Sequence, residues 1–282
     1  MKAINTIFVI FVLAMAISFV SCGDSAKTES APREGKMNDE LKLEGDKTIY
    51  GLACEGCSDS TIILLPNDGS DPVHYDILDA TRKHKVMGKP KVGDWVGLVL
   101  NPEDSTVADL VINLDELKGT WCYVVMPKMR DYDKMSPKLQ KRLMRDMPDS
   151  IKETFMIPRE YGFSLKRQWT AQSVGYVQEN TLGESPVVYP KLGFFTAWHI
   201  WNGKLVMTSG TPHFSDKTKE MTISDIRHDT CDIDFLGDDS LVLSSDGESR
   251  SYYRNSDVKN INKKAKEIVA KQKLKALEDI KN

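Results

Sequence analysis

The stretch Leu117-Lys118-Gly119-Thr120-Trp121-Cys122-Tyr123 decides how most of the chain is interpreted. Its glycine lets the backbone turn tightly, and its tryptophan is large enough to cover one end of a small barrel with a single apolar side chain. Trp121, Tyr123 and Val125 are two residues apart, so they share one face of a strand. We therefore predict that a β-barrel begins here and that Trp121 closes its floor.

Short antiparallel strands are predicted for the residues that follow, up to about residue 256. Asn202-Gly203 is a typical turn between two of them. A helix that begins at Ser136-Pro137 and ends at Pro148 interrupts the series. It has one apolar face and is expected to lie against the barrel or to cap its mouth. Closure into an up-and-down barrel leaves no edge strand exposed. The predicted strands after the first are 161–165, 170–177, 194–201, 204–208, 221–226, 230–235, 240–244 and 249–254.

Residues 115–256 resemble the short lipocalin-like domains of Gram-negative envelope lipoproteins. The resemblance implies a calycin barrel with space for a small apolar ligand. It also implies a late arginine, here Arg254, that lies across the indole of Trp121 as a cation–π partner, so Gly119, Trp121 and Arg254 are the expected barrel-closing residues. The matching motifs are LKGTW (117–121), FMIP (155–158), YGFSL (161–165), a hairpin from Trp198 or Trp201 to Leu205 or Val206, DSLVL (239–243) and YYR (252–254).

Six aromatic side chains are candidates for the lining of a ligand cavity inside this barrel. A barrel of this size either fills with side chains or holds one small ligand, and the same aromatics serve equally well as ordinary core. The sequence leaves both alternatives open. The candidates are Phe163, Trp169, Tyr176, Phe194, Trp198 and Phe214.

Residues 47–114 predict a smaller β-barrel of the OB kind. Five runs with strand character, at 48–52, 61–65, 73–77, 92–100 and 106–113, are separated by turns rich in Asn, Gly and Pro. The net charge of −3 shows no basic bias, and the cluster Arg82-Lys83-His84-Lys85 is interpreted as a solvated loop, so no nucleic-acid partner is expected. The predicted fold class is therefore all-β: a small OB-like β-barrel, then a lipocalin-like up-and-down antiparallel β-barrel, with a helical insertion and a C-terminal helix.

Cys54 and Cys57 form a C-x-x-C motif. A structural disulfide is the favoured interpretation, and a metal or redox-sensing site and a pair of reduced thiols are the alternatives. The segment 51–57 resembles the C-x-x-C segment of NlpE-type envelope-stress lipoproteins, which implies a metal or redox sensor, although it lacks the proline expected before the first cysteine. Cys122 is expected on the outer face of its strand and Cys231 on the inner face, without a bridge between them. No cofactor is expected, except for a metal at Cys54 and Cys57 in the sensor alternative.

The first 21 residues are interpreted as a lipoprotein signal peptide. Lys2 precedes an apolar run at 7–20 that is short for a transmembrane helix. The run ends in Phe-Val-Ser-Cys-Gly, which resembles the lipobox of bacterial lipoproteins and implies cleavage before Cys22 and lipidation of Cys22. An ordinary secretory signal is the alternative. The polar residues 22–46 predict a flexible tether, and the expected location is the cell envelope, anchored by lipid to the outer membrane and facing either side.

Residues 257–282 predict a basic helix, with eight lysines against four acidic residues, that lies on its own barrel or on anionic headgroups. The chain has no nucleophile elbow, P-loop, H-E-x-x-H motif or Rossmann fingerprint, so we do not expect an enzyme. The favoured function is a membrane-anchored lipoprotein that binds a small apolar ligand or acts in envelope assembly. The alternatives are the metal or redox sensor and a structural lipoprotein with a filled barrel and an unidentified protein partner.

Overall fold

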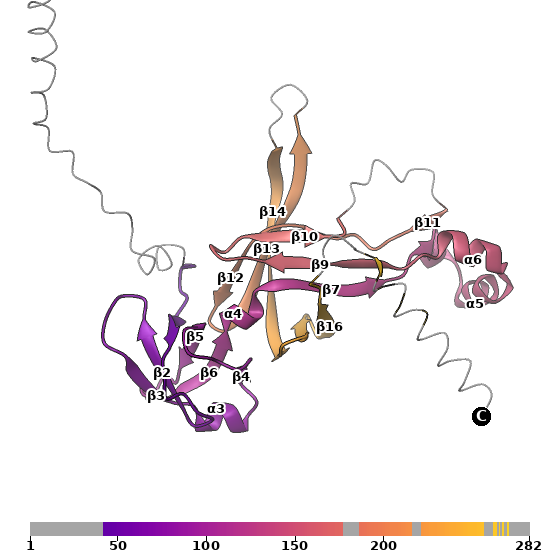
Figure 1. Ribbon diagram of the computed structural model, residues 1–282. Helices are drawn as coiled ribbons and strands as arrows, with labels where there is room; N and C mark the ends of the chain where they lie inside the picture. The colour runs from indigo at the N-terminus through magenta and orange to yellow at the C-terminus, as the bar shows by residue number, and fades with distance from the viewer. Residues whose placement is uncertain are drawn as a thin grey trace, which may run out of the picture. The chain divides into compact units, whose positions relative to one another are not determined.

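The computed structural model describes residues 42–176, 186–215 and 221–256, together with residues 262, 263, 265, 267 and 270 (Figure 1). All of them belong to one compact unit, which runs from Glu34 to Asn282. The predicted signal peptide, Cys22, most of the tether and most of the predicted C-terminal helix lie outside the described residues.

The first half of the described chain is a six-stranded sheet with two short helices. Its elements are β1 (Ile49–Ala53), β2 (Thr61–Pro66), β3 (Val73–Asp76), α3 (Leu78–Arg82), β4 (Val86–Met87), β5 (Trp95–Leu100), β6 (Ala108–Asn113) and α4 (Leu114–Leu117). The strands lie in the order β3-β2-β1-β5-β6-β4, and a parallel bridge from Asp76 to Val107 joins the end of β3 to the start of β6. The strands pair antiparallel except for the short β4, which is parallel to β6, and the bridge from β3 to β6 gives the connectivity of the predicted OB-like barrel.

Alternating side chains explain why these strands form. In β2, Ile62 and Leu64 are buried, whereas the alternate residues Ile63 and Leu65 are more exposed. At the end of β6, the side chain of Asn113 accepts a hydrogen bond from the amide of Glu116 and so caps α4. This cap turns the chain directly into the second barrel.

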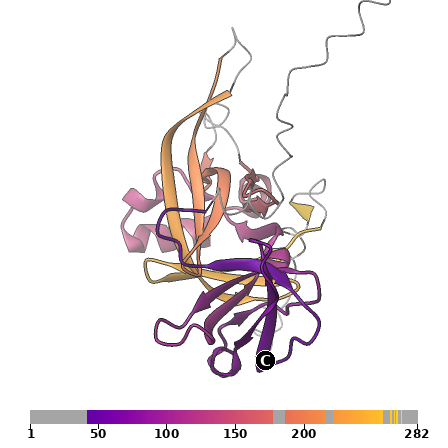
Figure 2. The same ribbon diagram turned by 90° about the vertical axis from the view of Figure 1, so that its left-hand side faces the viewer.

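The second half is an eight-stranded antiparallel sheet in the order β10-β9-β7-β16-β15-β14-β13-β12 (Figures 1 and 2). A small pair, β8 with β11, and three short helices accompany it. The elements are β7 (Gly119–Val125), β8 (Lys128–Met129), η2 (Tyr132–Lys134), α5 (Pro137–Asp146), α6 (Asp149–Phe155), β9 (Arg159–Leu165), β10 (Ala171–Val174), β11 (Val187–Val188), β12 (Phe194–Trp201), β13 (Lys204–Phe214), β14 (Met221–Leu236), β15 (Ser240–Ser245) and β16 (Glu248–Arg254).

The two outer strands of this sheet, β10 and β12, meet and nearly close it into a barrel. Thr170 makes an antiparallel bridge with Ala197, and the amide of Trp198 donates to the carbonyl of Trp169 at 2.9 Å. Side-chain hydrogen bonds of Ser173 add to this contact. A nearly closed, antiparallel, eight-stranded barrel confirms the predicted all-β fold class.

One hydrophobic core joins the two barrels. Tyr50 and Trp95 of the first barrel pack on Trp169 and Trp198 of the second, with ring centroids 4.8 to 6.4 Å apart. The hydroxyl of Tyr50 also donates to the carbonyl of Ile200. The two barrels predicted from the sequence are therefore packed against each other. The shared core contains Tyr50, Met87, Trp95, Ile112, Leu114, Leu117, Trp121, Phe163, Leu165, Trp169, Ala171, Trp198, Ile200, Leu205, Met207, Ile233, Leu236, Leu241 and Leu243.

The helix predicted from Ser136 to Pro148 is α5, and a second helix that was not predicted, α6, follows it directly. Met147 adopts an extended conformation between them, as expected for the residue before a proline, and Pro148 caps α6. None of the residues of α5 is buried. The first of the two expected positions, with the apolar face of the helix buried against the barrel, is therefore not observed.

The strands predicted at 221–226 and 230–235 are one continuous strand, β14. The polar residues 227–229 between them pair with β13 as the flanking residues do. The register shifts between Ser209 and Thr211, and Asp225 on the opposite strand has a φ of 50°. This β-bulge absorbs one extra residue without ending the strand.

The outer face of the barrel is covered near Glu160. The backbone amide of Asn262 donates to the carboxylate of Glu160 at 2.5 Å, and the hydroxyl of Tyr253 donates to the same carboxylate at 2.5 Å. Glu160 and Ala265 are fully buried. Cys122 is also fully buried, although it was expected on the outer face of β7, so both faces of the sheet are shielded here.

Candidate ligand cavity and barrel floor

Trp121 and Arg254 form the floor of the second barrel. Trp121 is fully buried, and its indole N–H donates to the carbonyl of Leu117 at 2.8 Å. The guanidinium carbon of Arg254 lies 4.1 Å from the centre of the Trp121 ring. Its Nη1 and Nη2 atoms donate to the carbonyls of Lys118 and Glu116 at 2.8 and 2.5 Å. Arg254 thus connects β16, the last strand of the barrel, to the residues that lead into β7, its first strand.

Gly119 makes room for this arginine. Its φ of 127° lies in the region that favours glycine, and a Cβ atom at this position would stand 2.3 Å from Nη1 of Arg254. Burial lowers the pKa of Arg254 from its ordinary value, although neighbouring carboxylates oppose this effect. The structure therefore brings Gly119, Trp121 and Arg254 together in one closing contact whose role is structural.

Three of the six aromatic candidates lie in the packed interior. Phe163, Trp169 and Trp198 are buried members of the shared core. The ring of Phe163 is 6.0 Å from Phe195 and 5.2 Å from Tyr252, and these neighbours fill the space next to it. Side chains that pack one another in this way are the filled alternative for a barrel of this size.

The other three candidates are elsewhere. Tyr176 and Phe194 pack edge to face, 5.2 Å apart and partly exposed, near the junction of β10 with β12. Phe214 is 69% exposed at the end of β13, paired with Met221 on β14. The prediction that Phe214 lines a cavity is wrong, because β13 extends beyond the strands that build the barrel wall.

The aromatic cluster between the barrels holds two buried indole N–H groups. Neither Trp95 Nε1 nor Trp169 Nε1 has a hydrogen-bond partner in the part of the chain that the structure describes. Trp169 has a φ of 58°, which is rare for a bulky residue, and His199 stacks on its ring at 5.2 Å. Burial lowers the pKa of His199, so the neutral imidazole is favoured there.

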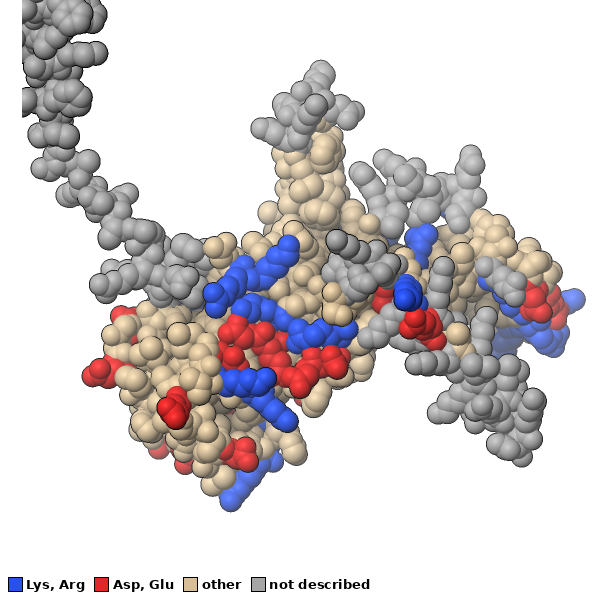
Figure 3. All heavy atoms as spheres, in the orientation of Figure 1, with Lys and Arg blue, Asp and Glu red and all other residues tan. Residues whose placement is uncertain are grey.

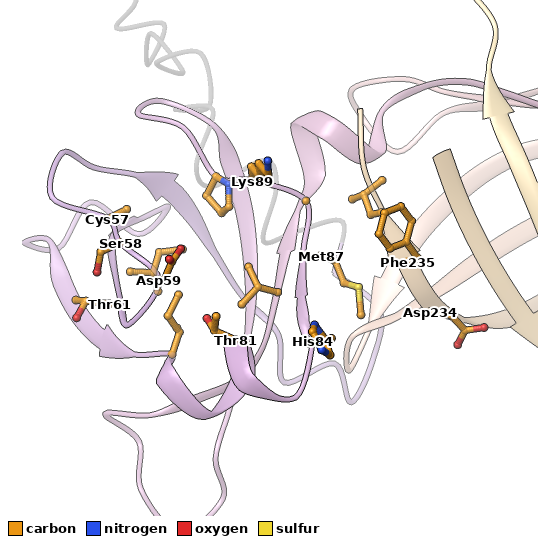
Figure 4. A pocket seen from close by; sticks show the side chains of 16 residues that line it. Cys57, Ser58, Asp59, Thr61, Thr81, His84, Met87, Lys89, Asp234 and Phe235 are labelled. Carbon is orange, nitrogen blue, oxygen red and sulfur yellow. The ribbon is translucent and has the colours of Figure 1, made fainter. Parts of the chain in front are cut away.

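A cavity of about 530 Å³ lies between the first barrel and the end of β14 (Figure 4). Its volume is in the range of small-molecule sites, which is roughly 300–1,000 Å³. The amide of Gly88 donates to the carbonyl of Leu236 at 3.2 Å and joins the two barrels beside it. The cavity is lined by Cys57, Ser58, Asp59, Thr61, Ile62, Ile77, Thr81, His84, Val86, Met87, Gly88, Lys89, Pro90, Asp234, Phe235 and Leu236.

The walls of this cavity, which we call the seam cavity, are of two kinds. Its apolar wall includes the buried side chains of Ile62, Ile77 and Met87. The hydroxyl of Thr81 is buried in the wall and has no hydrogen-bond partner among the described residues. A buried hydroxyl without a partner calls for a water molecule or a ligand atom. The other polar groups of the lining are Ser58, Asp59, Thr61, His84, Lys89 and Asp234.

Phe235 reaches the seam cavity because of a second β-bulge. Its place two residues after Ile233 predicts an inward side chain, but the register shifts between Ile233 and Phe235. Ile233 is buried, whereas Phe235 is 51% exposed and lies across from Met87 in Figure 4. No signal in the sequence marks this shift of register. The segments that line the seam cavity are also far apart in the sequence. Sequence reasoning therefore missed the cavity.

Cys57 lies in the wall of the seam cavity. Its thiol donates to the carbonyl of Cys54 at 3.1 Å and accepts from the amide of Ile63 at 3.4 Å. No disulfide joins Cys54, Cys57, Cys122 or Cys231, so the favoured interpretation of the C-x-x-C motif is not what the structure has. Burial raises the pKa of the Cys231 thiol.

The described residues contain neither a cluster of metal ligands nor a membrane-spanning helix. No group of three or more His, Cys, Asp or Glu side chains is arranged to hold a metal ion within that part of the chain. Among the same residues, no helix is both long and apolar enough to cross a bilayer.

Comparison with known proteins gives little further information. No protein-family model matches the chain, and no curated protein matches it. A solved structure, described as a lipocalin-like protein from Bacteroides thetaiotaomicron, shares 17% identity over 49% of this chain and 95% of that chain, with a TM-score of 0.25. At this TM-score the fold assignment rests on the strand order and the barrel closure described above.

Proposed function

We propose that this protein is a lipid-anchored protein of the cell envelope that binds a small, mainly apolar molecule in the seam cavity. The proposal rests on one observation: a cavity of ligand size, with an apolar wall and a few polar groups, lies where the two barrels meet. The ligand site is thus placed outside the barrel interior, where Trp121, Phe163 and Trp198 occupy the space.

Native mass spectrometry of the protein isolated from its own envelope tests this proposal. Ser58 is an exposed residue of the cavity lining, so Ser58→Trp is expected to occupy the cavity with an indole. Ser70→Trp, on an exposed loop that does not line the cavity, is the matched control. We expect a small-molecule adduct on the wild type and on Ser70→Trp, and none on Ser58→Trp. An adduct on all three proteins would place the ligand elsewhere.

The anchor is a separate part of the proposal. Its support is the lipobox-like ending of the N-terminal apolar run, with Cys22 as the acceptor. In cells fed a palmitate analogue, the wild type and Cys54→Ser are expected to carry the label, and Cys22→Ser is expected to lose it. Equal labelling of Cys22→Ser would refute lipidation at this cysteine.

A structural or assembly role is the second candidate. The packed interior of the second barrel favours it, because a filled barrel has no need of a ligand. In that case, the wild-type protein from its envelope carries no adduct, and a partner protein is recovered by crosslinking. Absence of both adduct and partner would count against both candidates.

A further inference from the structure

The helix α5 is amphipathic, yet the part of the chain that the structure describes does not bury its apolar side. At 100° per residue, the three apolar residues Leu139, Leu143 and Met144 lie on one side of it. Leu139 is 49% exposed, Met144 is also exposed, and Leu143 is half-buried. An apolar side of this kind normally packs on the core of its own protein.

The opposite side of α5 is basic. Lys138, Lys141, Arg142 and Arg145 share this side and are all exposed, and Asp146 is the only acidic residue of the helix. Asp146 already pairs with both arginines, at 3.4 and 2.8 Å. At the right of Figure 3, where Figure 1 places α5, blue atoms lie on the surface with a smaller group of red atoms beside them. The helix thus combines four cationic groups with exposed apolar residues.

We infer that α5 binds the surface of an anionic phospholipid bilayer. A helix in the plane of such a surface buries its apolar residues at the boundary between headgroups and acyl chains, while its Lys and Arg side chains reach the phosphates. Charge complementarity favours an anionic surface over a zwitterionic one, since each basic residue near the surface adds to the attraction. The contact is independent of ligand binding in the seam cavity and of lipidation at Cys22.

Hydrogen–deuterium exchange of residues 137–146 tests the inference in the full-length protein. The protein is mixed with vesicles of phosphatidylcholine alone, or of phosphatidylcholine with phosphatidylglycerol. We expect exchange in α5 to slow by about tenfold with the anionic vesicles only. Raising the salt concentration to about 1 M should remove the effect, because the Debye length then falls to about 3 Å. An N-terminal anchor does not confound the result, because the protection is read at α5.

Charge reversals on α5 and on α3 distinguish a specific contact from general attraction. Lys138→Glu with Lys141→Glu is expected to abolish the protection. Arg82→Glu with Lys83→Glu, an equal charge change at the exposed last residue and C-cap of α3, should retain it. Leu139→Ser with Met144→Ser should also weaken it. The inference fails if no protection occurs, if neutral vesicles protect α5 equally, or if both double reversals act alike. Protection by soluble polyglutamate but not by vesicles would instead point to an acidic protein.

Discussion

A single methyl group at Gly119 is expected to open the floor of the barrel. Gly119→Ala places a Cβ atom against Nη1 of Arg254 and leaves alanine in a backbone conformation that is unfavourable for it. The free energy of unfolding is therefore expected to fall by about 3 kcal/mol or more. Gly247→Ala is the matched control, because Gly247 also has a positive φ but faces open space, and its cost should be about 1 kcal/mol. Urea unfolding measures both. Equal losses would show that Arg254 does not constrain Gly119.

The buried hydroxyl of Tyr252 is expected to make the free energy of unfolding depend on pH in the alkaline range. Burial raises its pKa from the ordinary value of 10.0 to about 12. Below pH 10 the hydroxyl is protonated in both the folded and the unfolded chain. Between about pH 10 and 12 only the unfolded chain releases the proton, so the free energy of unfolding should fall, by roughly 2–3 kcal/mol from this residue. Urea titrations across this range should show a smaller fall in Tyr252→Phe, and an unchanged slope would contradict the assignment.

Individual side chains were predictable where one local rule decided their position. The tight turn at Gly119 and the covering role of Trp121 follow from the residues themselves, whereas the contact of Arg254 with Trp121 was expected from the resemblance to lipocalin-like domains. Phe214 and Phe235 were not predictable in the same way. Their positions depend on how far β13 extends and on a bulge in β14, and neither is encoded in strand alternation.

Among the strands, the closure between β10 and β12 is held by few contacts, and Ser173 provides two of them. Its hydroxyl donates to the carbonyl of Gly193 and accepts from the amide of Phe195, both at 2.7 Å. Ser173→Ala should cost about 1–2 kcal/mol and speed amide exchange at Phe195. Ser244→Ala, which removes an exposed hydrogen bond to Asp234, should change stability by less than about 0.5 kcal/mol. Unchanged exchange at Phe195 would mean that the closure does not depend on Ser173.

Element boundaries could be predicted where turn residues or alternation marked them. Strands β2 and β12 lie close to where their apolar runs place them. The helix α3 and the short strand β4 were missed, because that part of the chain is dominated by charged residues and was interpreted as a loop. Pro148 was correctly given as the end of a helix, but the second helix that begins after it was not predicted.

For the chain as a whole, the shared aromatic core makes the two barrels one cooperative unit. Trp95→Ala removes a buried ring that lies 4.8 Å from the ring of Trp169, and the free energy of unfolding is expected to fall by about 3–5 kcal/mol. The substitution leaves an empty space in the core that both barrels share. The decrease in the free energy of unfolding should therefore be the same whether unfolding is followed by far-ultraviolet circular dichroism or by tryptophan fluorescence. Val92→Ala, at an exposed position, is the control. Two separate transitions in the wild type would show that the barrels unfold independently.

The sequence indicated two successive barrels but not the way they pack. Strand periodicity identifies an element and its buried face, and it carries no information about which distant element covers that face. The seam cavity depends on such distant packing, since its lining comes from β2, from the α3–β4 region and from the end of β14. Sequence reasoning therefore placed the ligand inside the barrel, where the aromatic residues cluster.

Hydrogen–deuterium exchange can show where the ligand is bound. Protein isolated from its own envelope is compared before and after extraction with organic solvent and refolding. The account requires faster exchange after extraction at 57–61, 81–90 and 234–236, with little change at 198–207 inside the barrel. Changes confined to 198–207 and to Phe163 would place the ligand in the barrel interior and contradict the account. No change anywhere would contradict ligand binding itself.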